Sequence, residues 1–306
     1  MTSNQLRQKF LDFMSTKGHI VIPSASLIPK EDPTLLFVNS GMYPLIPFLM
    51  GQKHPSGTRL ADSQKVIRTV DIDEVGDNRH LSFFEMLGSW SLGDYTKVES
   101  ITWGFEFLTD KKWLAMDPKR LFVTVYKGSK EVPVDQEAIN TWVKCFDSVG
   151  IKANIGIEYD FKSNQKNLDN QKYIYRITKK SGKDNWWGLP YRGPCGPCSE
   201  IYYLYDHNNL DFEHSFESMN IVEIEDFIES QIMEIWNHVF MEYEGEWGEN
   251  YEPVKLKLLK QKNIDTGMGF ERLLALLQGV NTVQQTDVLQ PIANIANKWA
   301  DNCIYL

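Results

Sequence analysis

Residues 82–95 read Ser82-Phe-Phe-Glu-Met-Leu-Gly-Ser-Trp-Ser-Leu-Gly-Asp-Tyr95, and with residues 63–70 they decide the fold that we expect. Both stretches contain the aromatic or β-branched residues that strands favour. The polar, acidic stretch 71–79 between them is typical of a loop. We therefore predict strands at 63–70 and 82–90 that form a long hairpin. Side chains alternate along a strand, so one face of the first strand carries Gln64, Val66, Arg68 and Val70.

Helical spacing of apolar residues predicts three helices around this hairpin. The first covers residues 4–17, with Ser3 or Asn4 as its cap and Gly18 just past its end. Its apolar face consists of Leu6, Phe10, Phe13 and Met14. The others lie near 98–109 and at 134–148, and the apolar stripe of the last consists of Ile139, Trp142, Val143 and Phe146. Such a stripe is typical of a face turned to the core, so we assign it no chemistry.

Further strands are expected at five places, which are residues 34–38, 121–126, 200–205, 232–243 and 253–259. Residues 162–172 have almost no apolar side chain, which is typical of a solvated loop. Strands and helices do not alternate one for one, and no repeat of fixed period is present. We therefore predict an α+β fold. Because no clear linker divides the sequence, we expect a single domain over residues 1–306.

The composition excludes several classes of protein. The chain has 306 residues, with 32 Lys plus Arg against 41 Asp plus Glu, and its net charge of −9 is too acidic for an unaided nucleic-acid coat. An apolar fraction of 42% excludes disorder as the main state. The longest nearly uncharged apolar stretch, residues 42–50, is far shorter than the ~20 residues of a spanning helix. The N-terminal segment lacks the apolar core of a signal peptide, so we expect a cytoplasmic protein that does not cross a membrane.

The four cysteines are too few for a disulfide scaffold, and two of them, Cys195 and Cys198, form a Cys-Gly-Pro-Cys pair. Such a pair could hold zinc or act in redox chemistry. Zinc normally needs four ligands, however, and neither Cys145 nor Cys303 belongs to a second pair. We therefore expect no zinc in this chain and interpret the pair as a buried structural turn.

Residues 265–272, Asp265-Thr-Gly-Met-Gly-Phe-Glu-Arg272, predict a glycine turn that feeds a helix. Backbone N–H groups at such a turn can bind an anion or a nucleotide, although Gly267 and Gly269 could also form a simple tight turn. Arg272, one turn into the helix, could lie flat on a purine ring. Asp265 could hold an ammonium group, or it could only cap the turn. The residues alone leave these alternatives open.

Several segments together resemble the catalytic core of the alanyl-tRNA synthetases, a family of class II aminoacyl-tRNA synthetases. Segments similar to the three motifs of that class are residues 26–42, residues 63–68 with 82–95, and residues 265–272. Three more matching segments are Asp184-Asn-Trp-Trp187, Gly193-Pro-Cys-Gly-Pro-Cys-Ser-Glu200 and Glu234-Ile-Trp-Asn-His-Val-Phe240. The resemblance covers almost the whole sequence and implies a mainly antiparallel sheet flanked by helices.

The resemblance implies an enzyme, an alanine–tRNA ligase that uses ATP and Mg²⁺ to activate L-alanine and then transfers alanine to the acceptor end of tRNA-Ala. Arg68 and Arg272 would be catalytic, with Arg68 on the α-phosphate and Arg272 above the adenine. By the resemblance, Phe84 would stack under the adenine. Phe83 and Phe84 cannot both face the pocket, because neighbours on a strand point opposite ways. The residues implied to bind ATP are Arg68, His80, Phe84, Trp187, Ile235, Trp236, Asn237, Gly269 and Arg272.

By the same resemblance, the alanine pocket consists of Trp187, Asn237, Val239, Asp265 and Gly267. Asp265 would pair with the substrate ammonium, and Asn237 would orient the amino acid. Glu234 is the candidate ligand of Mg²⁺. In a regular strand Glu234 and Asn237 face opposite sides, so both reach the site only if a bulge intervenes.

The sequence departs from the family at three places. The loop 71–79 is short and acidic where the family commonly has a Gly-Gly-Lys-His-Asn-Asp stretch. Residues His80-Leu-Ser82 stand where the family usually reads His-His-Thr, so we expect one histidine contact to ATP to be missing. The sequence stops at Leu306, and we therefore expect a core without a tRNA-recognition, editing or C-terminal domain.

Two rival functions remain open at this point. An alanine-adenylating paralogue could load an acceptor other than tRNA, which the acidic net charge favours, since tRNA binding draws on basic contacts. A non-catalytic binding module could also retain the fold. The joint presence of Arg68, Asn237, Asp265 and Arg272 argues against such a module, which would not need all four.

Overall fold

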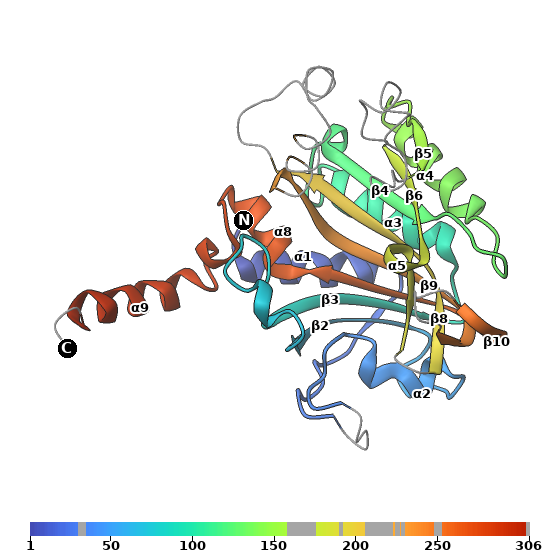
Figure 1. The fold of residues 1–306 in the computed structure, drawn as a ribbon, viewed down its shortest axis with the longest axis horizontal. Helices are drawn as coiled ribbons and strands as arrows, with labels where there is room; N and C mark the ends of the chain where they lie inside the picture. The colour runs from blue at the N-terminus through green and yellow to red at the C-terminus, as the bar shows by residue number, and fades with distance from the viewer. Residues whose placement is uncertain are drawn as a thin grey trace. The chain divides into compact units, whose positions relative to one another are not determined.

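The computed structural model describes residues 1–29, 35–157, 176–189, 192–205, 223, 227, 230–247 and 253–303 (Figure 1). The chain divides into two compact units. The first unit consists of Met1–Leu45, Ala61–Gly88 and Gly267–Leu306, and the second consists of Ile46–Leu60 and Ser89–Thr266. Both units are built from segments that lie far apart in the sequence. The loop predicted at 162–172 lies outside the described residues.

The first unit begins with helix α1, Ser3–Thr16. Thr2 and Gln5 form a reciprocal capping box, in which the Thr2 hydroxyl accepts a hydrogen bond from the Gln5 N–H and the Gln5 side chain accepts one from the Thr2 N–H. Such caps stabilise a helix by about 1 kcal/mol. The predicted helix is confirmed, together with its buried face of Leu6, Phe10, Phe13 and Met14. Its cap is Thr2 and not Ser3 or Asn4.

The strands of the first unit follow the order β1, β2, β3 and the end of β10. Their bounds are Ile20–Val21, Arg59–Ile67, Phe83–Leu92 and Pro253–Gly269. The two strands of the predicted hairpin are confirmed, and the Arg68 N–H still donates to the Ser82 carbonyl at 2.8 Å. The first strand ends earlier than predicted, however. Gln64 and Val66 are buried, whereas Val70 lies past the strand with 85% of its surface exposed.

The strand predicted at 34–38 is wrong for the described residues 35–38, which form no strand. Leu36 is 76% exposed, although Val38 is buried. The Val38 N–H donates to the Leu27 carbonyl, and the Val38 carbonyl accepts from the Ile67 N–H. Val38 thus bonds to two different segments and does not pair continuously with one strand. Apolar composition alone could not show this, because it does not distinguish a strand from a buried loop crossing.

The second unit holds the longer part of the sheet, in the order β10, β9, β8, β4, β6, β5, with β7 beside β8. The new strands are Leu121–Tyr126 (β4), Ile155–Ile157 (β5), Ile177–Lys180 (β6), Trp186–Gly188 (β7), Arg192–Leu204 (β8) and Ile232–Trp247 (β9). β8 runs antiparallel to β4, β7 and β9, and β6 runs parallel to β4 and β5. This largely antiparallel sheet with helices confirms the predicted α+β class.

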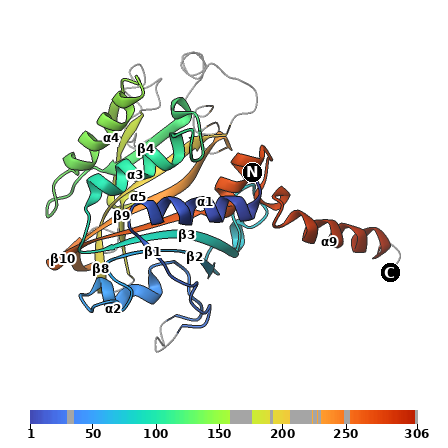
Figure 2. The same ribbon diagram turned by 180° about the vertical axis from the view of Figure 1, so that it is seen from behind.

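Two helices of the second unit, α3 (Lys97–Thr109) and α4 (Gln136–Ser148), lie side by side against these strands (Figure 2). The Ser100 hydroxyl of α3 bonds to His238 on β9, and the Trp142 indole of α4 donates to Ser199 on β8, both at 2.8 Å. The helices predicted near 98–109 and at 134–148 are therefore confirmed. In the stripe of α4, three side chains are buried and Val143 is half-buried.

Short helices connect the longer elements. They are α2 (Ile46–Leu49), α5 (Gly182–Asn185) and the 3-10 helices η1 (Tyr43–Leu45), η2 (Ile72–Glu74), η3 (Pro118–Arg120) and η5 (Val283–Gln285). The first unit ends with α8 (Phe270–Gln278) and α9 (Gln290–Cys303), which extends away from α8 in Figure 1. Among the helices that the structure describes, none is long and apolar enough to cross a membrane.

The glycine turn predicted at Gly267 and Gly269 is wrong. β10 continues through both glycines, and α8 begins directly after them. A Cβ atom on Gly267 would lie 2.7 Å from the Met86 sulfur on β3, so Gly267 packs closely against that side chain within a strand and does not form a turn. Gly269 is the residue before the helix, with a φ of −66° that any residue can adopt.

Candidate active site

The predicted site residues divide between the two units. Those of the first unit are Arg68, His80, Phe84, Gly267, Gly269 and Arg272, and those of the second are Trp187, Glu234, Ile235, Trp236, Asn237, Val239 and Asp265. Neither unit carries the whole predicted set.

In the first unit, Arg68 follows the end of β2 and lies over the ring of Phe84, with its guanidinium carbon 5.4 Å from the ring centre. Its Nε donates to the Asn39 carbonyl at 2.9 Å, which fixes the side chain. Phe84 is half-buried, whereas Phe83 is 50% exposed, as expected for neighbours on a strand. The structure thus joins a cation and an aromatic face, a pair that can receive a phosphate and a flat ring.

Arg272 lies in the first turn of α8, where its Nε donates to the Arg79 carbonyl at 3.3 Å. A Cβ on Gly269 would lie 3.3 Å from the Arg272 Cδ, so the absence of a side chain there leaves room for this arginine. Arg272 therefore contacts the end of the loop between β2 and β3. His80, in that same loop, faces two carboxylates, Glu74 and Asp77.

In the second unit, Asp265 lies within β10, so the interpretation of this residue as a turn cap is wrong. It is 7% exposed, and its Oδ1 accepts a hydrogen bond of 2.6 Å from the Trp90 indole. Burial raises the pKa of Asp265 to about 7, against the opposing effect of the Trp90 hydrogen bond. A carboxylate in such a dry position gains most from a cationic partner.

The bulge that Glu234 and Asn237 require is present in β9. Glu200 on β8 lies opposite Asn237, and Tyr202 lies opposite Glu234, with the register shift between them. Glu200 and Tyr202 share a face of β8 because they are two residues apart, so their partners on β9 share that face too. Ile235 is the extra residue of the bulge. The condition that the sequence set for these two side chains is therefore confirmed.

This face carries two carboxyl groups that influence each other. Burial and the neighbouring Glu234 raise the pKa of Glu200 well above its usual range. One oxygen of Glu200 accepts hydrogen bonds from the Tyr202 hydroxyl at 2.7 Å and from the Thr124 hydroxyl at 3.3 Å. Two carboxylates that repel each other in a partly dry place suit a divalent cation such as Mg²⁺. Within the part of the chain that the structure describes, no three His, Cys, Asp or Glu side chains form a metal-binding group, so phosphate or water oxygens would have to complete the coordination.

Asn237 lies beside this pair and carries an unused acceptor. Its Oδ1 is buried and finds no hydrogen-bond partner among the described residues. A buried carbonyl oxygen without a donor costs about 1–3 kcal/mol, so the position favours a ligand that brings an N–H group. Trp187 on β7 is half-buried and Val239 on β9 is buried.

Ile235 and Trp236 are core residues, with 1% and 0% of their surfaces exposed. The Trp236 ring packs edge-on against Phe107 of α3, at 6.0 Å between ring centres. Only the backbone of these two residues is therefore left for contact with a nucleotide.

Sequence reasoning missed Glu200 and Trp90 as site residues. Glu200 ends the quoted segment Gly193–Glu200, and an acidic residue inside an apolar strand was the signal that could have found it. Trp90 lies 175 positions from Asp265, and a contact at that separation leaves no local pattern. Cys195 and Cys198 are buried as predicted, but they lie in strand β8 and not in a turn.

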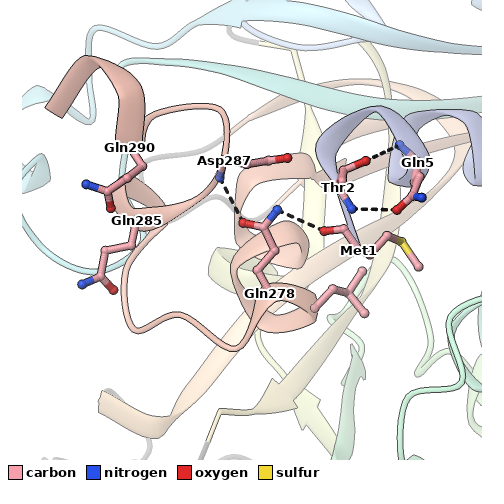
Figure 3. A pocket seen from close by; sticks show the side chains of 8 residues that line it. Met1, Thr2, Gln5, Gln278, Gln285, Asp287 and Gln290 are labelled. Carbon is pink, nitrogen blue, oxygen red and sulfur yellow. Dashed lines mark hydrogen bonds between the residues drawn. The ribbon is translucent and has the colours of Figure 1, made fainter. Parts of the chain in front are cut away.

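A separate open cavity of about 490 Å³ lies in the first unit (Figure 3). It is lined by Met1, Thr2, Gln5, Leu277, Gln278, Gln285, Asp287 and Gln290. Gln278 lies between Met1 and Asp287, donating to the Met1 carbonyl and accepting from the Asp287 N–H, both at 3.0 Å. Its lining includes none of the residues predicted to bind ATP or alanine. These bonds tie the start of α1 to the end of α8.

Comparison with known proteins adds independent findings. The model of a family described as tRNA synthetases class II (A) matches residues 5–305. The alanine–tRNA ligase of Treponema denticola is 42% identical over 99% of this chain, and that of Treponema pallidum is 41% identical over 95%. The chain spans 45% and 42% of those two relatives' lengths, less than half of each. A solved pyrrolysyl-tRNA synthetase from Desulfitobacterium hafniense aligns with 93% of this chain and 72% of its own, at 12% identity and a TM-score of 0.34.

Proposed function

The chain belongs to the family of class II tRNA synthetases (A), and on that premise we propose that it activates L-alanine with ATP and transfers the alanyl group to the 3′ end of tRNA-Ala. A carboxylate oxygen of alanine attacks the α-phosphorus of ATP, and the bond to the bridging oxygen breaks to release pyrophosphate. A ribose hydroxyl of the terminal tRNA nucleotide then attacks the carbonyl carbon, and AMP leaves. This function accords with the cytoplasmic location that the sequence predicts.

The observation that carries the alanine assignment is the environment of Asp265. Its carboxylate is buried, its pKa is raised to about 7, and the hydrogen bond it accepts comes from a neutral indole. An ammonium group would supply the missing positive charge and hold the carboxylate ionised. We assign Asp265 to the ammonium of alanine. The unpartnered Asn237 Oδ1 is a second acceptor for the same amino acid. Trp187, Val239 and Gly267 are assigned to alanine as well.

For ATP, we assign Arg68 to the α-phosphate. Its guanidinium is already fixed by the bond to Asn39, so it can stabilise the developing charge without reorganising. Phe84 and Arg272 are assigned to the adenine, and His80 is assigned to a phosphate. Gly269 is assigned to ATP binding because its lack of a side chain leaves room for Arg272. Trp187, Ile235, Trp236 and Asn237 are also assigned to ATP, Ile235 and Trp236 through their backbone.

Glu200 and Glu234 would hold Mg²⁺ in this proposal. When bound with ATP, Mg²⁺ neutralises charge on the phosphate oxygens. The protein's part is to present two carboxylates on one face, which the bulge at Ile235 does, and to keep Glu200 in place through Tyr202 and Thr124.

Direct detection of the intermediate tests this function. Rapid quenching of the enzyme with Mg²⁺, ATP and alanine, followed by mass spectrometry, should show alanyl-adenylate at an amount close to that of the enzyme. The same reaction with leucine or phenylalanine should show no adenylate above background. Adenylate from the large amino acids, or none from alanine, would contradict the proposal.

A further inference from the structure

The acidic loop between β2 and β3 closes on its own histidine. His80 Nδ1 lies 2.6 Å from the Asp77 Oδ2, and His80 Nε2 lies 3.1 Å from the Glu74 Oε2. A neutral imidazole carries one N–H, so it can donate to only one of these carboxylates. Each ring nitrogen of His80 therefore has its own anionic acceptor at hydrogen-bond distance.

The two carboxylates are held very differently. Asp77 also accepts backbone hydrogen bonds from Arg79 at 2.8 Å and from His80 at 2.6 Å. Burial opposes its ionisation, but these bonds and the His80 ring lower the pKa of Asp77. Asp77 is thus a built-in part of the loop. Glu74 reaches the ring from the exposed helix η2, and 64% of its side chain is exposed, against 38% for Asp77.

The loop itself is fixed to the C-terminal part of the first unit. The Val283 N–H donates to the Asn78 carbonyl at 3.1 Å, and the Gln284 side chain donates to the Asp77 carbonyl at 3.4 Å. Arg272 donates to the Arg79 carbonyl at 3.3 Å. The His80 ring is therefore anchored to the segment that carries Arg272, while its Nε2 partner Glu74 belongs to the exposed helix η2.

We propose that Glu74 is an internal competitor that occupies His80 Nε2 in place of a phosphate of ATP, and that Asp77 is the positioning residue that holds the ring for that exchange. This inference rests on the proposed function, because it takes His80 as a contact of ATP. A phosphate oxygen and a carboxylate oxygen are both anionic acceptors of the same N–H, so one displaces the other. ATP displaces Glu74, the exposed partner, and leaves Asp77 in place. The shortened acidic loop therefore weakens ATP binding instead of helping it.

Binding of Mg²⁺-ATP without alanine, measured by calorimetry, tests this inference. Glu74→Gln should tighten ATP binding by about 2- to 5-fold, the range that one exposed ion pair supports. The matched control is Asp73→Asn, which removes the same charge from the neighbouring residue of η2 and should change ATP binding by less than half as much. Asp77→Asn should weaken ATP binding by about 2- to 5-fold. Alanine binding should not change in any of these variants.

A double-mutant cycle with His80→Gln separates the contact from general loop charge. In the His80→Gln background the effect of Glu74→Gln should vanish. Three results would overturn the inference. Glu74→Gln and Asp73→Asn could change ATP affinity equally, or the effect of Glu74→Gln on ATP affinity could persist in the His80→Gln background. The third is that neither the native chain nor Glu74→Gln binds ATP. Adenylate formation decides the proposed function separately, so either result can fail alone.

Discussion

Asp265 carries a buried carboxylate whose partner in the fold is the neutral indole of Trp90. If it binds the ammonium of alanine, the charge-assisted bond contributes about 1.5–3 kcal/mol. Asp265→Asn keeps the shape and removes the charge, so alanine affinity should fall by roughly 10- to 200-fold. ATP affinity should stay nearly unchanged. Separate titrations with alanine and with ATP on the folded variant check this, and equal losses would remove Asp265 from the alanine pocket.

The same variant should stabilise the free protein at high pH. The folded pKa of Asp265, about 7, lies above the ordinary aspartate value, so its stability contribution is present at low pH and is lost as pH rises through 7. Asp265→Asn removes this loss, and its free energy of unfolding should exceed that of the native chain by roughly 1–4 kcal/mol at pH 8. Urea unfolding at pH 5 and pH 8 measures the difference.

The gain from Asp265→Asn should be smaller at pH 5 than at pH 8. The exposed residue Asp12 offers a matched control, and Asp12→Asn should show no comparable rise with pH. A destabilised Asp265→Asn protein, or a gain that does not depend on pH, would show that the carboxylate is not strained by burial.

Arg68 is the residue whose contact should strengthen most as the reaction proceeds. Arg68→Ala should lower the rate of adenylate formation by about 100-fold or more, which corresponds to roughly 2.7–4 kcal/mol for a lost oxyanion donor, while alanine affinity changes little. Single-turnover kinetics with alanine varied over its binding range separates the two quantities. A variant changed only in alanine affinity would place Arg68 elsewhere.

At the scale of elements, the bulge in β9 is the feature that brings Glu234 and Glu200 to one face. If the two carboxylates hold Mg²⁺ with ATP, Glu200→Gln and Glu234→Gln should each raise the Mg²⁺ concentration for half-maximal adenylate formation by about 10-fold or more. The control is Glu246→Gln, farther along the same strand, where the glutamate pairs with exposed Lys255. An equal shift in the control, or none in either variant of the pair, would contradict the assignment.

Helices and most strands could be predicted from local pattern. The apolar faces of α1 and α4 repeat every three to four residues, and that period is a property of the sequence alone. The join of β10 and α8 could not be predicted in the same way. Gly267 suggests a turn, but it lies within β10 with the Met86 side chain of β3 packed against it, and no local pattern shows that contact.

The site divides along the same line. The identity of Asp265, Asn237 and Arg68 as candidates came from motif resemblance, and the need for a bulge came from strand geometry. The partners that set their chemistry, Trp90 for Asp265 and Glu200 for Glu234, come from distant strands. Burial in the folded chain raises the pKa of Asp265 against the effect of the Trp90 hydrogen bond, and that burial could not be predicted from sequence.

At the scale of the whole molecule, the two compact units interleave along the chain, and β2, β3 and β10 each contribute residues to both. No single change of composition could mark such a division, which is why the sequence predicts one domain without a linker. The net charge of −9 also belongs to this scale. An acidic chain repels an anionic partner such as tRNA, except where Lys and Arg side chains contact it.

Transfer to tRNA should therefore be weak and steeply dependent on salt for this chain alone. Each phosphate that a Lys or Arg neutralises steepens the fall of log affinity with log salt by about 0.9 on a duplex. Charging of tRNA-Ala and of an acceptor-stem minihelix at 50 and 200 mM salt measures the effect. Strong charging that salt does not change would contradict this expectation. If the true acceptor is not tRNA, adenylate should still form, but no alanine should be transferred to tRNA-Ala.

The central claim is that this chain activates alanine, and exchange of labelled pyrophosphate into ATP with each of the twenty amino acids tests it most directly. Alanine should support the fastest Mg²⁺-dependent exchange. Glycine and serine should be slower but measurable, because one methylene or hydroxyl changes binding by only ~1–3 kcal/mol. Exchange that is equal for large amino acids, or absent with alanine, would contradict the account.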